Sequence, residues 1–135
     1  MTHHTLIASF ESGRMPPAGF HHHEHVCVAW SYLRRYPLLE ALERFRTGLR
    51  GFAAAQGKPD LYHETITTAY VLLINERMDA GPADADWDAF ARLNADLLTW
   101  RPSVLDRYYR TETLASDRAR RVFVMPDRLA PYEHM

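Results

Sequence analysis

Cysteine, lysine and long apolar runs are scarce in this chain of 135 residues. Its one cysteine, Cys27, excludes an intramolecular disulfide, which favours a cytoplasmic location. The formal net charge is −1, so the chain has no excess of positive charge to attract nucleic acid or an anionic membrane. No stretch approaches the ~18 apolar residues that span a bilayer. The composition therefore predicts a cytoplasmic protein with no nucleic-acid or membrane partner.

Most of the sequence carries apolar residues at the period of an amphipathic helix. Gly57 suits a left-handed C-cap, and Asp60 suits the N-cap of the following helix. We expect helices from about His22 to Pro37, from Leu38 to Gly57, from Asp60 to Ala80 and from Trp87 to before Arg101, with shorter ones ending near Gly13 and at residues 104–109 and 113–121. The prediction is a compact all-α bundle of four to five main helices in a single domain, residues 1–135, with an extended tail from about residue 122.

Four histidines lie within five residues at the start of one predicted helix: His21, His22, His23 and His25. Residues three or four apart share a helix face, so His25 can pair with His22 or with His21. His22 lies on the same side as the apolar stripe that we place inward, whereas His21 is expected at or before the first turn. Neutral imidazole is the commonest metal ligand and a frequent acid–base group. The spacing therefore predicts His22 and His25 as ligands, with His21 as the alternative to His22.

A second polar pair, His63-Glu64, stands in the first turn of another predicted helix. The positive end of a helix dipole disfavours imidazolium, so we expect His63 in the neutral form that binds a metal. Glu64 can be a ligand, an orienting group or a base acting on bound water. We predict a metal site shared by two helices, with ligands His22, His25, His63 and Glu64, in which His63 and Glu64 are also the catalytic residues.

This donor set suits one divalent transition metal, with Zn or Fe expected first and Mn, Ni or Cu as alternatives. One cysteine cannot supply the thiolates of a zinc finger, and His63-Glu64 lacks the second histidine of an H-E-x-x-H motif. A bound ion would activate water or polarise a small polar substrate. The expected function is a small metal-dependent enzyme of the hydrolase or lyase type, or a non-haem iron oxygenase.

Two other functions stay open at this point. One is a metal-free enzyme that uses His63 and Glu64 as an acid–base pair. The other is a non-enzymatic helical module that binds a ligand or a partner. An apolar run is rich enough for a homodimer interface as well as for a core. This run comprises Leu38, Leu42, Phe45, Leu49 and Phe52.

A small-molecule substrate would need polar contacts near the histidines. Thr67 and Tyr70 follow His63 on the same predicted helix and supply hydroxyl groups. Arg120 or Arg121 could anchor a carboxylate or phosphate, because a guanidinium binds such groups in a forked geometry. We name Thr67, Tyr70 and Arg121 as the substrate-binding candidates.

The two histidine segments also resemble a poorly characterised family of small helical proteins from bacteria and fungi. Residues 20–26 match its F-x-H-x-x-H-V signature, residues 29–34 match an Ala-Trp-x-Tyr-Leu-Arg helix, and residues 62–67 match Y-H-E-T-I-T. The resemblance spans nearly the whole chain and favours His22 over His21 as the partner of His25. It implies no particular reaction.

Several other residues have a simpler structural interpretation. Cys27 lies inside an apolar helix and is predicted to be a buried structural thiol. Trp30, Trp87 and Trp100 are predicted to lie in the core, at helical spacing with other apolar residues. Asn94 and Asp96 form no metal-binding pattern and are predicted to lie on the surface.

Overall fold

The computed structural model describes residues 3–128, which form eight α-helices and three short 3-10 helices. No strand occurs among these residues. The α-helices are α1 (His3–Ser12), α2 (His22–Arg35), α3 (Leu38–Ala55), α4 (Glu64–Ala80), α5 (Trp87–Leu93), α6 (Ala95–Leu98), α7 (Thr111–Leu114) and α8 (Asp117–Arg121). The 3-10 helices are η1 (Pro17–Gly19), η2 (Pro59–Leu61) and η3 (Val104–Arg107). The predicted all-α fold is confirmed.

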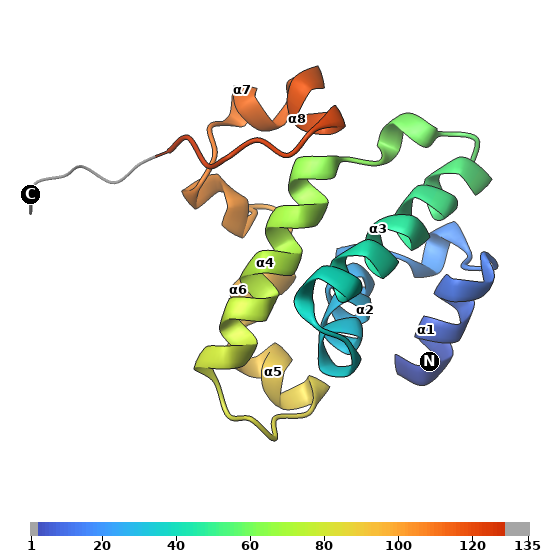
Figure 1. The fold of residues 1–135 in the computed structure, drawn as a ribbon, viewed down its shortest axis with the longest axis vertical. Helices are drawn as coiled ribbons and strands as arrows, with labels where there is room; N and C mark the ends of the chain where they lie inside the picture. Colours follow the sequence, from blue (N-terminus) through green and yellow to red (C-terminus); the bar gives the residue numbers. More distant parts are fainter. Residues whose placement is uncertain (1–2, 129–135) are drawn as a thin grey trace, which may run out of the picture.

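Helix α2 is central to the packing of the bundle. It contacts α1, α3, α4 and α6 (Figure 1). All seven residues from Val26 to Tyr32 are therefore buried. Cys27 is one of them, and burial raises the pKa of its thiol to about 11, as expected for a structural thiol.

Two positions, one in α3 and one just after it, require glycine. A Cβ atom on Gly48 would lie 2.2 Å from the Phe10 ring, so the absence of a side chain lets α1 approach α3. Gly57 has a φ of +69° and follows the end of α3, as predicted for a left-handed C-cap. The predicted N-cap at Asp60 is wrong, because residues 59–61 form η2 and His63 caps α4 instead.

Two predicted helices are each divided in the structure. The helix predicted from Trp87 breaks at Asn94. The Asn94 side-chain amide donates to the Phe90 carbonyl and accepts from Arg77. Asn94 is therefore buried, and the prediction that it lies on the surface is wrong. The helix predicted at residues 113–121 becomes α7 and α8, because Ser116 caps α8 through the N–H of Ala119.

Residues 122–128 carry no helix and pack along the start of α4. The Thr65 hydroxyl donates to the Val122 carbonyl at 2.8 Å and accepts from the Val124 N–H at 3.1 Å. Tyr109 donates to the Val124 carbonyl at 2.7 Å. These contacts hold the first part of the predicted tail against the bundle, whereas its residues 129–135 lie outside the described part of the chain.

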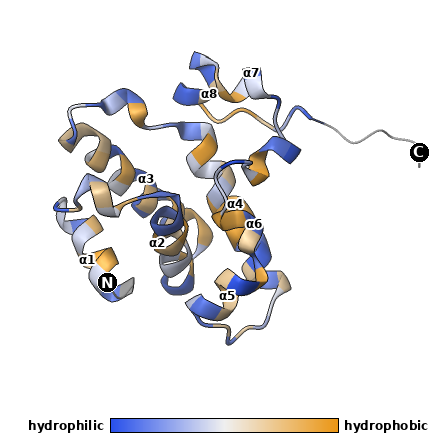
Figure 2. Cartoon of the chain, turned by 180° about the vertical axis from the view of Figure 1, so that it is seen from behind, coloured by the Kyte–Doolittle hydropathy of each residue, from blue (hydrophilic) through white to orange (hydrophobic). Residues whose placement is uncertain are grey.

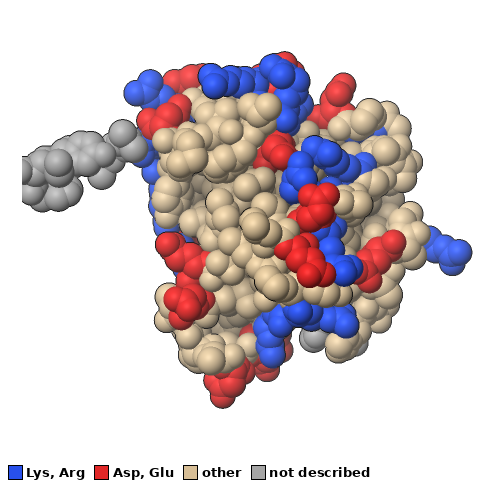
Figure 3. All heavy atoms as spheres, viewed as in Figure 1, with Lys and Arg blue, Asp and Glu red and all other residues tan. Residues whose placement is uncertain are grey.

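Hydrophobic residues are prominent on the central helices, and the outer loops are more hydrophilic (Figure 2). Acidic and basic side chains are interleaved on the face shown in Figure 3, where they border a broad uncharged area. No helix within residues 3–128 combines the length and the apolar character needed to cross a membrane.

Candidate functional site

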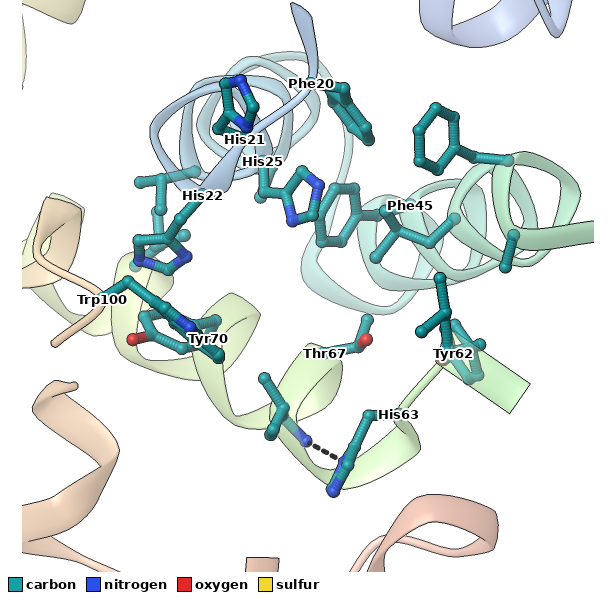
Figure 4. Close-up of a pocket in the computed structure, with 18 of the residues that line it drawn as sticks. Phe20, His21, His22, His25, Phe45, Tyr62, His63, Thr67, Tyr70 and Trp100 are labelled. Atoms are coloured by element: carbon teal, nitrogen blue, oxygen red, sulfur yellow. Dashed lines mark hydrogen bonds between the residues drawn. The ribbon is translucent and has the colours of Figure 1, made fainter. Parts of the chain in front are cut away.

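A cavity of about 590 Å³ lies between α2, α3 and α4, with further walls from η2, Trp100 and α8 (Figure 4). Its apolar lining comes from all three main helices and from the segments beside them: Phe20, Val26, Ala29, Phe45, Leu49, Phe52, Ala53, Leu61, Ile66, Ile74 and Trp100. Its polar lining consists of His21, His22, His25, Tyr62, His63, Thr67, Tyr70 and Arg120. The volume is in the range of small-molecule sites, and a mainly apolar wall with a few polar groups is typical of them.

His25 projects from the first turns of α2 toward this cavity (Figure 4). Its ring packs against Phe20, with 4.2 Å between the ring centroids. The residue is half-buried because the ring borders the cavity, but its Nε2 atom is buried and has no hydrogen-bond partner among the described residues. In that part of the chain, no other buried side-chain nitrogen or oxygen lacks a partner. An unpaired buried polar atom costs free energy, so this ring is unusual in the fold.

The same environment keeps His25 neutral. Burial lowers the pKa of its imidazole to about 4, and the neighbouring His22 acts in the same direction, whereas Glu24 and the backbone of Phe20 act to raise it. At neutral pH the ring therefore carries one N–H and one lone pair. It can donate or accept a hydrogen bond from a ligand, or coordinate a metal, without first losing a proton.

His22 lies one helical turn before His25 on the same side of α2. Its Nε2 donates to the Leu97 carbonyl at 2.8 Å, which leaves the lone pair of the neutral ring on Nδ1. Burial lowers the pKa of His22, and the charge of His23 adds to this effect. The ring packs edge-on against Tyr70 and lies 5.0 Å from the Trp100 ring, between centroids. The predicted His22–His25 pair is therefore found on one wall of the cavity.

His21 is the N-cap residue of α2 and is exposed, so it precedes the first turn as expected. Its backbone N–H donates to the Glu24 carboxylate at 2.9 Å, which satisfies one donor at the helix start. His23 is exposed and is not among the cavity-lining residues.

His63 borders the cavity, but both of its ring nitrogens are already bonded. Its Nδ1 accepts from the Ile66 N–H at 3.1 Å, so the side chain caps α4. Its Nε2 donates to the Leu114 carbonyl at 2.7 Å. Burial lowers the pKa of His63, and the charge of Arg120 acts in the same direction, whereas the hydrogen bond to the Leu114 backbone acts to raise it. In this arrangement the ring has no lone pair left for a metal or a substrate proton.

Glu64 points to α3 rather than to the histidines. Arg46 donates to both of its carboxylate oxygens, at 3.0 and 2.7 Å, and the Tyr62 hydroxyl also donates to it. Partial burial acts to raise the pKa of Glu64, but the hydrogen bonds from Arg46 and Tyr62 and the charge of Arg50 outweigh it and lower the pKa. A carboxylate held in this way is a weak base and is absent from the cavity lining.

Within residues 3–128, no three or more His, Cys, Asp or Glu side chains are grouped to hold a metal ion. The structure places His22 and His25 together but gives His63 and Glu64 other partners. The predicted set of four ligands is thus not assembled in this structure. A metal cofactor stays a prediction that can rest on His22 and His25 alone.

The three predicted substrate-binding residues lie in different places. Thr67 and Tyr70 line the cavity, where the Tyr70 hydroxyl is 2.8 Å from the Ser103 hydroxyl. Arg121 does not line it, because its guanidinium points to Asp117 at 2.7 Å on the outer side of α8. Arg120 lines the cavity instead.

Several lining residues were predicted only as core or as a dimer interface. Phe45, Leu49 and Phe52 belong to the apolar run of α3 and line the cavity. The periodicity of this run predicted that these residues face the interior, but it did not predict a cavity there. Trp100 is 43% exposed at the cavity rim rather than in the core. Asp96 binds Arg77 and Arg107, which ties α6 to α4 and η3.

No family model, curated protein or solved structure matches this chain. The resemblance of its histidine segments to a family of small helical proteins therefore stays a prediction.

Proposed function

We propose that the cavity binds a small, mainly apolar molecule that carries a polar group able to meet the imidazole of His25. The observation that carries this proposal is the buried, unpartnered Nε2 of His25, in a ring that borders a cavity of about 590 Å³. A protein gains nothing from an unpaired buried nitrogen unless another molecule supplies the partner. Because the ring is neutral, the matching group is a hydroxyl, carbonyl or amide.

The proposed ligand is less polar than the substrate expected from the histidines. Aromatic and aliphatic side chains from α2, α3 and α4 form most of the wall. The hydroxyl groups of Thr67 and Tyr70 lie on the same stretch of α4 and offer further hydrogen bonds. An apolar body gains free energy by leaving water, and these few polar groups would fix its orientation.

A neutral fluorescent probe, N-phenylnaphthylamine, tests the proposal. We expect saturable binding of one probe per chain. Ile66→Trp places a bulky ring in the cavity wall and should weaken binding at least about tenfold. Leu72→Trp is the matched control, because Leu72 is a partly exposed leucine of the same helix outside the cavity lining. Non-saturable binding, or equal binding by both variants, would refute the proposal.

A metal-dependent enzyme is the second candidate. It is favoured by two neutral imidazoles, those of His22 and His25, one helical turn apart on the cavity wall. With two ligands from the chain, water or substrate would fill the other positions of a Zn or Fe ion, and the ion would supply Lewis-acid chemistry.

Elemental analysis of protein purified without a polyhistidine tag tests this candidate. Cells would be supplied with Zn, Fe and Mn. One ion per chain that is lost in His22→Ala and His25→Ala but retained in His63→Ala would support the two-histidine site. A parent protein with no stoichiometric ion and no gain in thermal stability on adding one would eliminate it.

A further inference from the structure

Arg120 is the one Lys, Arg, Asp or Glu residue in the described lining of the cavity. It is half-buried on α8, and its Nη1 donates to the backbone carbonyl of Asp60 in η2. Arg120 thus stands where α8 and η2 meet the edge of the apolar space. An anionic group of a bound molecule finds an opposite fixed charge in the lining only at this position.

The guanidinium of Arg120 makes no ion pair with any carboxylate of residues 3–128. Asp60, the residue next to it in space, offers Arg120 its backbone carbonyl, and no ion pair joins the two side chains. Glu64 is held by Arg46, and Asp117 is paired with Arg121. Its single bond to a carbonyl leaves most of the five guanidinium N–H donors available.

We infer that the ligand is an organic acid whose carboxylate binds Arg120 at the edge of the cavity while its apolar body fills the space between α2, α3 and α4. This inference rests on the proposed function and names the class of ligand. A guanidinium binds a carboxylate through two parallel N–H donors, and such charge-assisted hydrogen bonds are stronger than neutral ones. Partial burial of Arg120 reduces competition from water and salt.

Decanoate and decanol form a matched pair of probes, because they share a chain and differ in the head group. Binding to the intact protein is measured by calorimetry, with decanoate kept below its micelle-forming concentration. We expect Arg120→Gln to weaken decanoate binding about 10-fold to 100-fold and to change decanol binding less than about twofold. Arg120→Lys keeps the charge without the fork and should recover part of the loss.

Arg121→Gln is the control, since Arg121 neighbours Arg120 but points away from the cavity toward Asp117. It should leave decanoate binding unchanged. Equal losses of decanoate and decanol affinity in Arg120→Gln would overturn the inference, as would binding of decanol without decanoate. Those results would leave the cavity proposal standing. If neither probe nor N-phenylnaphthylamine binds, the proposed function fails as well.

Discussion

Arg46 of α3 holds the carboxylate of Glu64 at the start of α4 through two hydrogen bonds, one to each oxygen. The side chains are 20% and 15% exposed, so water competes weakly for this pair. Arg46 also binds Glu43 on its own helix. The pair therefore joins two walls of the cavity, and it explains why Glu64 is turned away from the histidines.

Replacing Glu64 should reduce stability rather than ligand binding. Glu64→Gln keeps the shape but leaves Arg46 without its main carboxylate, so the free energy of unfolding should fall by about 1–3 kcal/mol in urea titrations. Glu43→Gln removes an exposed partner of the same arginine and should change stability by less than about 0.5 kcal/mol. Unchanged stability with lost probe binding would instead place Glu64 in the site.

The role of His63 as a cap predicts a difference between two substitutions. His63→Ala removes the acceptor for the Ile66 N–H and should lower the free energy of unfolding by about 1–2 kcal/mol. His63→Asn supplies a side-chain oxygen at the N-cap and should recover at least half of that loss. Both variants should bind N-phenylnaphthylamine like the parent. A large loss of binding in the Asn variant would contradict a purely structural role.

His25→Leu should stabilise the empty protein while impairing its function. It replaces an unpaired buried nitrogen with an apolar group of similar size, so the free energy of unfolding should rise by about 1 kcal/mol. Affinity for a ligand that bonds to the imidazole should fall. His23→Leu, at an exposed position of the same turn, should change stability by less than about 0.5 kcal/mol. A destabilised His25→Leu protein with normal binding would count against the proposed site.

Stability should fall as the pH drops below 6.5. The pKa of His25 is about 4 in the folded protein and 6.5 when unfolded, so between these values the unfolded chain binds more protons. The stabilisation is complete above pH 6.5 and is lost progressively toward pH 4. His22 and His63, with lowered pKa values, contribute in the same direction.

Urea titrations at pH 7.5 and pH 5 measure this effect. His25 alone should account for a loss of about 2 kcal/mol between the two conditions. In His25→Leu, that part of the loss should disappear while the part from His22 and His63 remains. An identical pH dependence in the parent and in His25→Leu would show that His25 does not titrate as its burial implies.

The helices of the site were predictable because their signals are local. The apolar period of α2, α3 and α4, the proline between α2 and α3 and the left-handed Gly57 each act within a few residues. The same local logic placed His22 and His25 on one face. This logic failed where a distant side chain determines the local structure. Asn94 accepts a hydrogen bond from Arg77 of α4, and the helix ends there although the apolar period continues.

The sequence by itself determined the all-α fold and the position of His22 and His25 on one face of a helix, since hydrophobic periodicity and helical spacing are properties of short segments. Only the tertiary structure decided the partners of His63 and Glu64, because the Leu114 carbonyl and Arg46 are 51 and 18 residues away. It also decided where the cavity lies and that Arg120 rather than Arg121 lines it. The cavity exists because the side chains of three helices do not fill the space between them. This depends on how the helices pack together, which no single segment determines.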